Sequence, residues 1–163
     1  MPEGLGEYLV VKSTEETGGE YVEMEWTMPP GAFAPPAHRH PSQVEEYEVL
    51  EGAFEVMIDG DWRRLDAGDS ASVPVSTDHT FRTIPGQAVR VRNFHRPGGR
   101  FDEFVEMQYR FVTSDRYKGL RHPSTAIVMA SAWHEHSDLL VPSSRALRWG
   151  VALLAPLKGL VRY

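Results

Sequence analysis

The sequence contains no cysteine at any of its 163 positions. This absence excludes thiolate metal sites, cysteine nucleophiles and disulfide frameworks, so histidine and the carboxylates are the strong metal ligands that remain. A disulfide is not needed for stability, because a chain of this length buries roughly 68 to 70% of its unfolded surface. We therefore expect a single core without covalent cross-links.

An excess of basic residues is also lacking. The chain has 17 Lys and Arg against 23 Asp and Glu, which gives a formal net charge of −6. Proteins that bind nucleic acids usually concentrate basic residues on one surface. We therefore expect no nucleic-acid partner.

No long uninterrupted apolar run is present. The longest apolar stretch, residues 146–161, contains Arg148, Pro156 and Lys158 and falls short of the roughly 20 apolar residues that a spanning helix needs. The first residues lack the basic and apolar regions of a secretion signal. These absences predict a cytoplasmic protein with no transmembrane segment.

Helical periodicity is missing from Leu5 to about Val112, where short β-rich runs alternate with turn residues. Asp59-Gly60 is a strong signal for a type I′ hairpin turn. Closing the sheet on itself removes the exposed edges of many short strands, so an antiparallel β-barrel is favoured over an open sheet. The predicted strands are Tyr8–Lys12, Tyr21–Met28, Val44–Glu51, Ala53–Ile58, Trp62–Leu65, Ser70–Val73, Thr80–Ile84, Val89–His95 and Phe101–Val112.

The pattern changes after about Ser114. Pro123 and Ser124 open an apolar run that suits a helix with proline in its first turn, and a second helix is predicted to begin near Ser143 or Ser144. We therefore divide the chain into a barrel, residues 1–113, and a helical extension, residues 114–163. Its last part mixes basic and apolar residues, as interfacial helices do, but packing of the apolar stripe on the barrel or on a second subunit is the preferred interpretation.

The strongest chemical signal is a group of metal-ligand residues. His38 and His40 are two residues apart, so in a strand they point to the same face and converge on one ion. The short linker that follows can turn the chain so that Glu45 enters from the neighbouring strand. His79 would join them from a distant strand that follows Pro74.

The spacing of these residues resembles the two sequence motifs of the cupin superfamily. The first motif is matched by Gly31, His38, His40, Glu45 and Gly52, and the second by Gly68, Pro74 and His79. Ser76 and Thr83 replace a glycine and an asparagine of the second motif, but neither change removes a ligand. The resemblance covers roughly residues 29–95 and implies an all-β fold, a cupin or jelly-roll barrel with a C-terminal helical extension, which pairs as a homodimer.

The resemblance also implies a divalent transition metal held by His38, His40, Glu45 and His79. Three imidazoles and one carboxylate leave positions open on a six-coordinate ion, which suits Fe, Mn, Ni or Zn better than Ca or Mg. An ion with open positions polarises or activates a bound molecule.

Two classes of function remain open from the sequence. The first is a metal-dependent oxygenase, isomerase or cyclase that acts on a small organic molecule in the barrel, with Glu45 as the catalytic group. The alternative is a cupin that binds a small molecule without catalysis, because the fold alone does not determine function. The sequence leaves open whether the chain is an enzyme.

Aromatic residues near the predicted ligands are expected to line the pocket. Strand alternation from Glu45 sends Tyr47 inward and Glu46 to the opposite face. The predicted pocket-lining residues are Tyr47, Phe33 and Phe81.

The other histidines are not expected to bind metal. His134 and His136 are two residues apart, which on a helix turns their side chains roughly 200° from each other, so both are expected at the surface. His95 and His122 have no suitably spaced partner and are expected to be structural or solvent-exposed.

Overall fold

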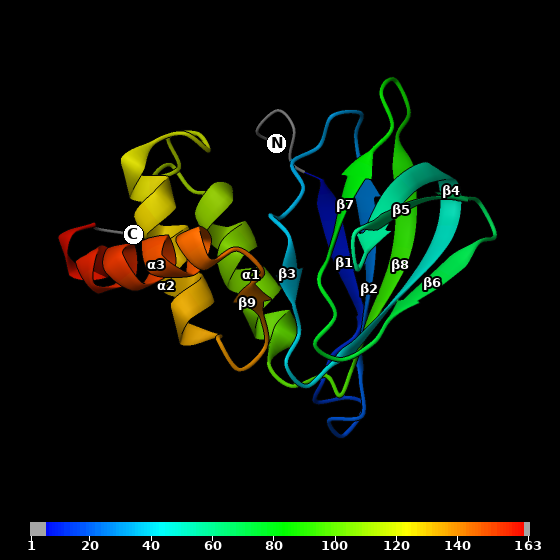
Figure 1. Ribbon diagram of the computed structural model, residues 1–163, viewed down its shortest axis with the longest axis horizontal. Coiled ribbons are helices and arrows are strands. Elements are labelled where there is room, and N and C mark those ends of the chain that lie inside the picture. Colours follow the sequence, from blue (N-terminus) through cyan, green and yellow to red (C-terminus); the bar gives the residue numbers. More distant parts are fainter. Residues whose placement is uncertain (1–5, 162–163) are drawn as a thin grey trace.

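The computed structural model describes residues 6–161, which form a β-barrel with a group of helices beside it (Figure 1). The strands are β1 (Glu7–Lys12), β2 (Val22–Met28), β3 (His38–Arg39), β4 (Val44–Ile58), β5 (Asp61–Asp66), β6 (Ser70–Val73), β7 (His79–Thr83), β8 (Val89–Arg96) and β9 (Val141–Pro142). The helices are α1 (Phe101–Val112), α2 (Pro123–Glu135), α3 (Arg145–Leu154) and the 3₁₀ helix η1 (Ala155–Leu160). Every strand pairing is antiparallel, so the predicted antiparallel barrel is confirmed.

Strand β4 belongs to both sheets of the barrel. Its first half pairs with β6 and β8, and its second half pairs with β5 and β7. The register shifts between Val49 and Glu51, and Gly52 follows with a φ of 74°. A Cβ at Gly52 would lie 2.2 Å from the carbonyl oxygen of Ala88. Glycine is therefore required where the strand bends from one sheet into the other, and the two strands predicted over residues 44–58 are one.

The barrel interior is filled with apolar side chains. Along β4, Tyr47, Val49, Phe54 and Val56 are buried, because alternate residues of a strand point to the same face. They pack with buried residues of the other strands, namely Met28, Ile58, Leu65, Val73, Val89 and Val91. Asp59 and Gly60, with φ values of 52° and 90°, form the tight turn predicted between β4 and β5.

The strand predicted over Phe101–Val112 is wrong, because these residues form α1. Phe101, Phe104 and Val105 are buried, and their spacing of three and four residues places them on one face of a helix. β8 ends at Arg96 and the first helix begins at Phe101, before the predicted boundary at residue 114.

The two predicted helices are confirmed. α2 begins at Pro123, and the His122 side chain caps it by accepting a hydrogen bond from the Ser124 backbone N–H. α3 begins at Arg145 after its N-cap residue Ser144. α3 lies against α2 and has no buried residue, so its apolar stripe does not pack on the barrel. Packing on a second subunit stays a prediction.

The helical part covers one side of the barrel and also extends its sheet (Figure 1). Val22 and Met24 of β2 pack against Phe101, Phe104 and Leu139. The short strand β9 pairs with β3, with Pro142 opposite His38. The helices are therefore joined to the strand that carries the first predicted ligand. Within residues 6–161, no helix combines the length and the apolar character needed to cross a bilayer.

Candidate metal centre

The structure brings together the four predicted ligands. His38, His40, Glu45 and His79 each offer one ligand atom, and these atoms lie within 4.8 Å of one another. β3 supplies His38, β4 supplies Glu45, and β7 begins at His79, which lies opposite His38 in the strand register. All four side chains are buried. The group forms where residues far apart in the sequence meet at one end of the barrel.

Each of the three imidazoles is oriented by a backbone carbonyl. The Nδ1 atoms of His38 and His79 lie 3.0 Å and 2.9 Å from the carbonyl oxygens of Pro36 and Thr77. Nδ1 of His40 lies 2.7 Å from the carbonyl oxygen of Leu139. A carbonyl oxygen only accepts hydrogen bonds, so each Nδ1 carries a proton, and Nε2 is the ring nitrogen left to face the other ligands. This pattern is typical of histidines that ligate a metal through Nε2.

The atoms that face one another have no hydrogen-bond partner. Nε2 of His40, Nε2 of His79 and Oε2 of Glu45 are buried and make no hydrogen bond within the described part of the chain. Oε2 of Glu45 lies 2.7 Å from Nε2 of His79 and 3.4 Å from Nε2 of His40. Buried polar atoms are costly without a partner. The buried group is compatible with a metal ion, which would satisfy all of these atoms.

Asn93 holds the carboxylate of Glu45 in this orientation. Its side-chain amide donates to Oε1 of Glu45 at 2.9 Å and to the backbone carbonyl of Glu46 at 3.2 Å. Oε1 is therefore occupied, and Oε2 is the oxygen that faces the histidines. Asn93 was not predicted as a site residue, although it is an inward-pointing polar position on β8, where Val89 and Val91 are also buried.

His95 also belongs to this site. It is opposite Glu45 in the register of β4 and β8, fully buried, and its Nε2 lies 3.0 Å from Oδ1 of Asn93 and 3.4 Å from Oε1 of Glu45. The expectation of a structural role is consistent with this position, but solvent exposure is not. The alternation of buried residues along β8, which also points Asn93 inward, could have predicted that His95 is buried.

The electrostatics of the site keep Glu45 ionised and His95 neutral. Burial alone would raise the pKa of Glu45, but the imidazoles of His95 and His79 outweigh it and hold this pKa well below the usual range. Burial lowers the pKa of His95 to about 4 and, together with His79 and His40, lowers the pKa of His38 to about 3. Burial opposes protonation of His79 too, but the Glu45 carboxylate raises its pKa. An ionised Glu45 beside a neutral His38 is the protonation state in which these two ligands bind a cation.

Aromatic side chains of the helical part cover the group. The ring of Phe101 stacks on His95, with centroids 3.5 Å apart and an angle of 22° between the planes. The ring of Phe101 also lies 5.6 Å from that of His40, and the ring of Trp133 lies 5.7 Å from that of His38. The Phe101 contacts cover the group on the side that faces α1, and partly buried Trp133 lies beside it on α2.

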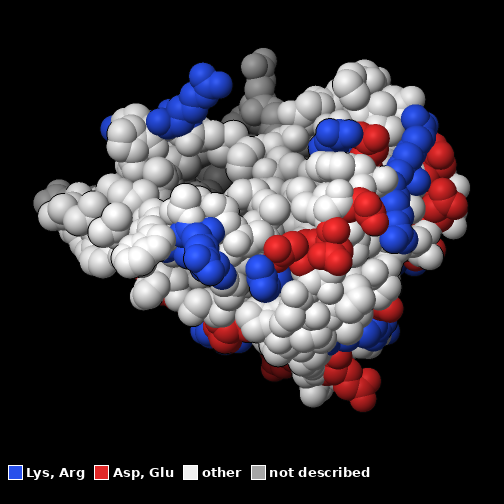
Figure 2. Space-filling model, viewed as in Figure 1, with Lys and Arg blue, Asp and Glu red and all other residues white. Residues whose placement is uncertain are grey.

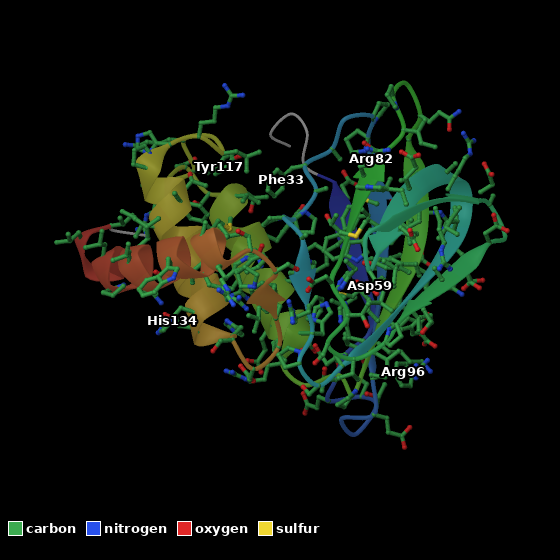
Figure 3. All side chains as sticks on the ribbon, viewed as in Figure 1. Phe33, Asp59, Arg82, Arg96, Tyr117 and His134 are labelled. Atoms are coloured by element: carbon green, nitrogen blue, oxygen red, sulfur yellow. The ribbon has the colours of Figure 1, made fainter. Side chains whose placement is uncertain are left out.

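The three predicted pocket-lining residues lie in different places. Tyr47 and Phe81 pack with Phe54 in the barrel core, with ring centroids 5.6 Å to 6.4 Å apart. Burial and then the nearby Glu45 carboxylate raise the pKa of Tyr47 well above its usual value, so its hydroxyl is neutral. Phe33 lies on the loop between β2 and β3 (Figure 3) with 52% of its surface exposed, apart from the buried ligand group.

The remaining histidines lie outside the group. His134 is exposed on α2, as expected. The expectation that His136 lies at the surface is wrong, because it is buried against Phe104 and its Nδ1 bonds to the carbonyl oxygen of Ala132. His136 ends α2 and turns the chain toward the barrel, a tertiary contact that helical spacing alone does not predict.

The comparisons with known proteins agree with this geometry. The profile of the cupin domain family matches residues 24–92, which include all four candidate ligands. The barrel is a cupin domain. No curated protein sequence matches the chain significantly.

Solved structures show the same cupin fold. The protein TT1209 from Thermus thermophilus superposes with a TM-score of 0.53 at 20% identity, over 60% of this chain and 88% of that one. KdgF from a Halomonas species superposes with a TM-score of 0.52 at 23% identity, over 62% of this chain and 87% of that one. A predicted oxalate decarboxylase from Thermotoga maritima superposes with a TM-score of 0.53 at 18% identity, over 56% of this chain and 80% of that one. These similarities confirm the predicted all-β cupin fold.

Proposed function

We propose that this cupin domain binds a divalent transition metal through His38, His40, Glu45 and His79 and acts on a small organic molecule. The observation that carries the proposal is the orientation of the buried ligand side chains, which face one another through atoms without a hydrogen bond. The three Nδ1 atoms are engaged by backbone carbonyls, while Nε2 of His40 and His79 and Oε2 of Glu45 have no hydrogen bond in the described chain. The mixed nitrogen and oxygen donor set suits Fe, Mn, Ni or Zn.

The residues of the chain would orient the ion and control protons beside it. Such an ion, when bound, supplies Lewis acidity or redox chemistry toward a molecule at its open positions. Asn93 fixes Oε1 of Glu45, so Oε2 is the atom that ligates or accepts a proton. Tyr47 carries a neutral hydroxyl next to this carboxylate and can donate a hydrogen bond to it. An oxygenase, isomerase or cyclase reaction would use this combination of a cation and an ionised carboxylate.

The exposure of the ligands indicates where a small molecule would enter. His40 and His79 keep 2% and 0% of their surface exposed, whereas His38 and Glu45 each keep 6%. Trp133, which is partly buried, lies next to His38. We propose that a small molecule reaches the centre from the side of His38 and Trp133. The reaction class rests on the donor set, because the similar structures support the fold alone.

Metal analysis tests the proposal directly. The parent, a His38→Ala, His79→Ala double variant and a His134→Ala control would be purified without an affinity tag and measured by elemental analysis. We expect about one Fe, Mn, Ni or Zn ion per chain in the parent and the control, and loss of the ion in the double variant. Equal and negligible metal in all three proteins after reconstitution would contradict the proposal.

A binding protein without catalysis is the second candidate. The observation that favours it is the aromatic surroundings of the site, with Trp133 beside His38 and Phe101 on His95, since small-molecule sites are lined mainly by apolar and aromatic side chains with a few polar groups. Turnover assays with the reconstituted parent and a Glu45→Gln variant separate the two. Activity in the parent that disappears in the variant supports catalysis, whereas ligand binding without turnover in the parent supports a binding protein.

We also propose a cytoplasmic homodimer. The support for dimerisation is the edge strand β1, which pairs with β2 alone within residues 6–161 and exposes Leu9 and Val11 at 62% and 39%. Exposed apolar residues on an edge strand favour pairing with a second chain. Light scattering would show a dimer for the parent and a monomer for a Leu9→Lys, Val11→Lys variant; a monomeric parent would contradict dimerisation.

A further inference from the structure

The outer face of α3 and η1 is apolar and has no partner within residues 6–161. Trp149 and Leu153 are each 70% exposed, and Leu160 on η1 is 80% exposed. Trp149 and Leu153 are four residues apart on one helix, so their side chains lie next to each other on one face. Exposed tryptophan and leucine side chains that cluster in this way usually mark an interaction surface.

Basic residues border this face, and Lys158 of η1 is paired with the Glu135 carboxylate of α2, with Nζ and Oε1 2.6 Å apart. Arg145 and Arg148 are exposed on α3, and together with Trp149 and Ala152 they line a shallow surface depression. Four of the chain's 17 basic residues lie in positions 139–163, and none of its 23 acidic residues does. Residues 139–163 therefore form a cationic apolar segment in a sequence whose net charge is −6.

This segment lies at one end of the molecule. α3 and η1 project away from the barrel (Figure 1), and in Figure 2 the atoms at this end are white and blue, whereas most of the red atoms lie on the barrel. A flat anionic surface could contact α3 without meeting the acidic residues visible on the barrel.

We propose that the α3–η1 face binds the surface of an anionic lipid bilayer. Trp149, Leu153 and Leu160 would enter the boundary between headgroups and acyl chains, and Arg145 and Arg148 would contact the lipid phosphates, as in amphipathic helices that lie in the membrane interface. A second copy of the chain fits less well. A symmetric contact through this face would bring the arginines of both copies together, with no carboxylate from the segment to compensate them.

Vesicle sedimentation tests the membrane proposal with the full-length chain. The parent would be mixed with vesicles of phosphatidylcholine alone or with one quarter phosphatidylglycerol, at low and high salt. We expect binding to the anionic vesicles that weakens with salt. The Arg145→Gln, Arg148→Gln variant should bind about 25-fold more weakly, since each basic residue contributes about 1 kcal/mol, or about fivefold.

A second variant tests the contribution of the apolar side chains to vesicle binding, with a matched control. A Trp149→Ser, Leu153→Ser variant should lose binding, whereas Trp62→Ser, which removes an exposed tryptophan from β5, should bind like the parent. Equal binding to neutral vesicles, or no binding by the parent, would overturn the proposal. It would also be overturned if light scattering showed an oligomer that dissociates in the Trp149→Ser, Leu153→Ser variant, because a second copy would then cover this face.

Discussion

The backbone carbonyl oxygen of Leu139 accepts a hydrogen bond of 2.7 Å from Nδ1 of His40, across 99 positions of sequence. The chain beyond the barrel therefore helps to orient a candidate ligand in it. Strand pairing between β9 and β3 and the bond from the Ser143 N–H to the Ala37 carbonyl support the same region. Contacts of this kind fix the tautomer and the direction of a ligating imidazole.

The tautomers of the histidines give a first prediction. In the metal-free protein at neutral pH, His38 and His40 should be protonated on Nδ1, because their partners are carbonyl oxygens. His122 should be protonated on Nε2, because its Nδ1 accepts from the Ser124 backbone N–H. Long-range proton–nitrogen correlation spectra distinguish these forms. An Nε2-protonated His40 would show that the Leu139 carbonyl does not orient the ring.

Asn93 gives a second prediction. An Asn93→Ala variant loses the amide that holds Oε1 of Glu45, and we expect its metal affinity to fall by about 10- to 100-fold. Glu46→Gln is the matched control, since Glu46 lies on the outer face of β4 and pairs with exposed Arg96; its affinity should stay within about twofold of the parent. Competition with a chelator of known affinity measures both. An unchanged affinity for Asn93→Ala would contradict the orienting role.

The stability of the metal-free protein should fall with acidification below about pH 6.5, the ordinary pKa of histidine. The pKa of His95 is about 4 in the folded protein and ordinary when unfolded, so between these values the unfolded chain binds a proton that the folded chain does not. Each such proton costs about 1.4 kcal/mol of unfolding free energy per pH unit. His38, whose pKa is also lowered, acts in the same direction over this range, and Glu45, whose pKa is lowered, does so only below its ordinary pKa of about 4.5. His79, whose pKa is raised, opposes them.

Urea unfolding at about pH 8, 6.5 and 5 measures this slope on both sides of the ordinary histidine pKa. A His95→Gln variant should lose less stability than the parent over the acidic half of this range, by about one proton's contribution. His134→Gln should follow the parent because His134 is exposed. A parent whose stability does not change on acidification would contradict a buried neutral His95.

Gly52 gives a prediction about the barrel itself. Gly52→Ala places a Cβ 2.2 Å from the Ala88 carbonyl oxygen, well inside van der Waals contact, at a position whose φ is 74°. Gly68 has a φ of 93° and open space around it. We expect Gly68→Ala to lower the free energy of unfolding by about 1 to 2 kcal/mol and Gly52→Ala by about 1 to 3 kcal/mol more. Equal losses in urea unfolding would show that β4 can move away from Ala88.

The barrel and its ligand group were predictable because they depend on local spacing. Alternation and turn residues mark the strands, and His38, His40, Glu45 and His79 were predicted as a group that the structure brings together. Their role as metal ligands stays a prediction.

The missed features depend on contacts between distant segments. α1 was predicted as a strand because Phe101–Val112 is rich in aromatic and β-branched residues, although its buried positions have helical spacing. His95 and Asn93 were missed because they join Glu45 through the pairing of β4 with β8. The contact of Leu139 with His40 was missed because it is made by a backbone carbonyl, which every residue type has.

The pairing of β3 with both β7 and β9 has a consequence for biosynthesis. A ribosome makes the chain from its N-terminus, so His38, His40, Glu45 and His79 are all synthesised before Leu139 and Pro142. In a nascent barrel, the four ligands would therefore be present before the Leu139 carbonyl orients His40 and before β9 pairs with β3. We expect stable loading of an ion to follow the synthesis of residues 139–142 and their docking on β3.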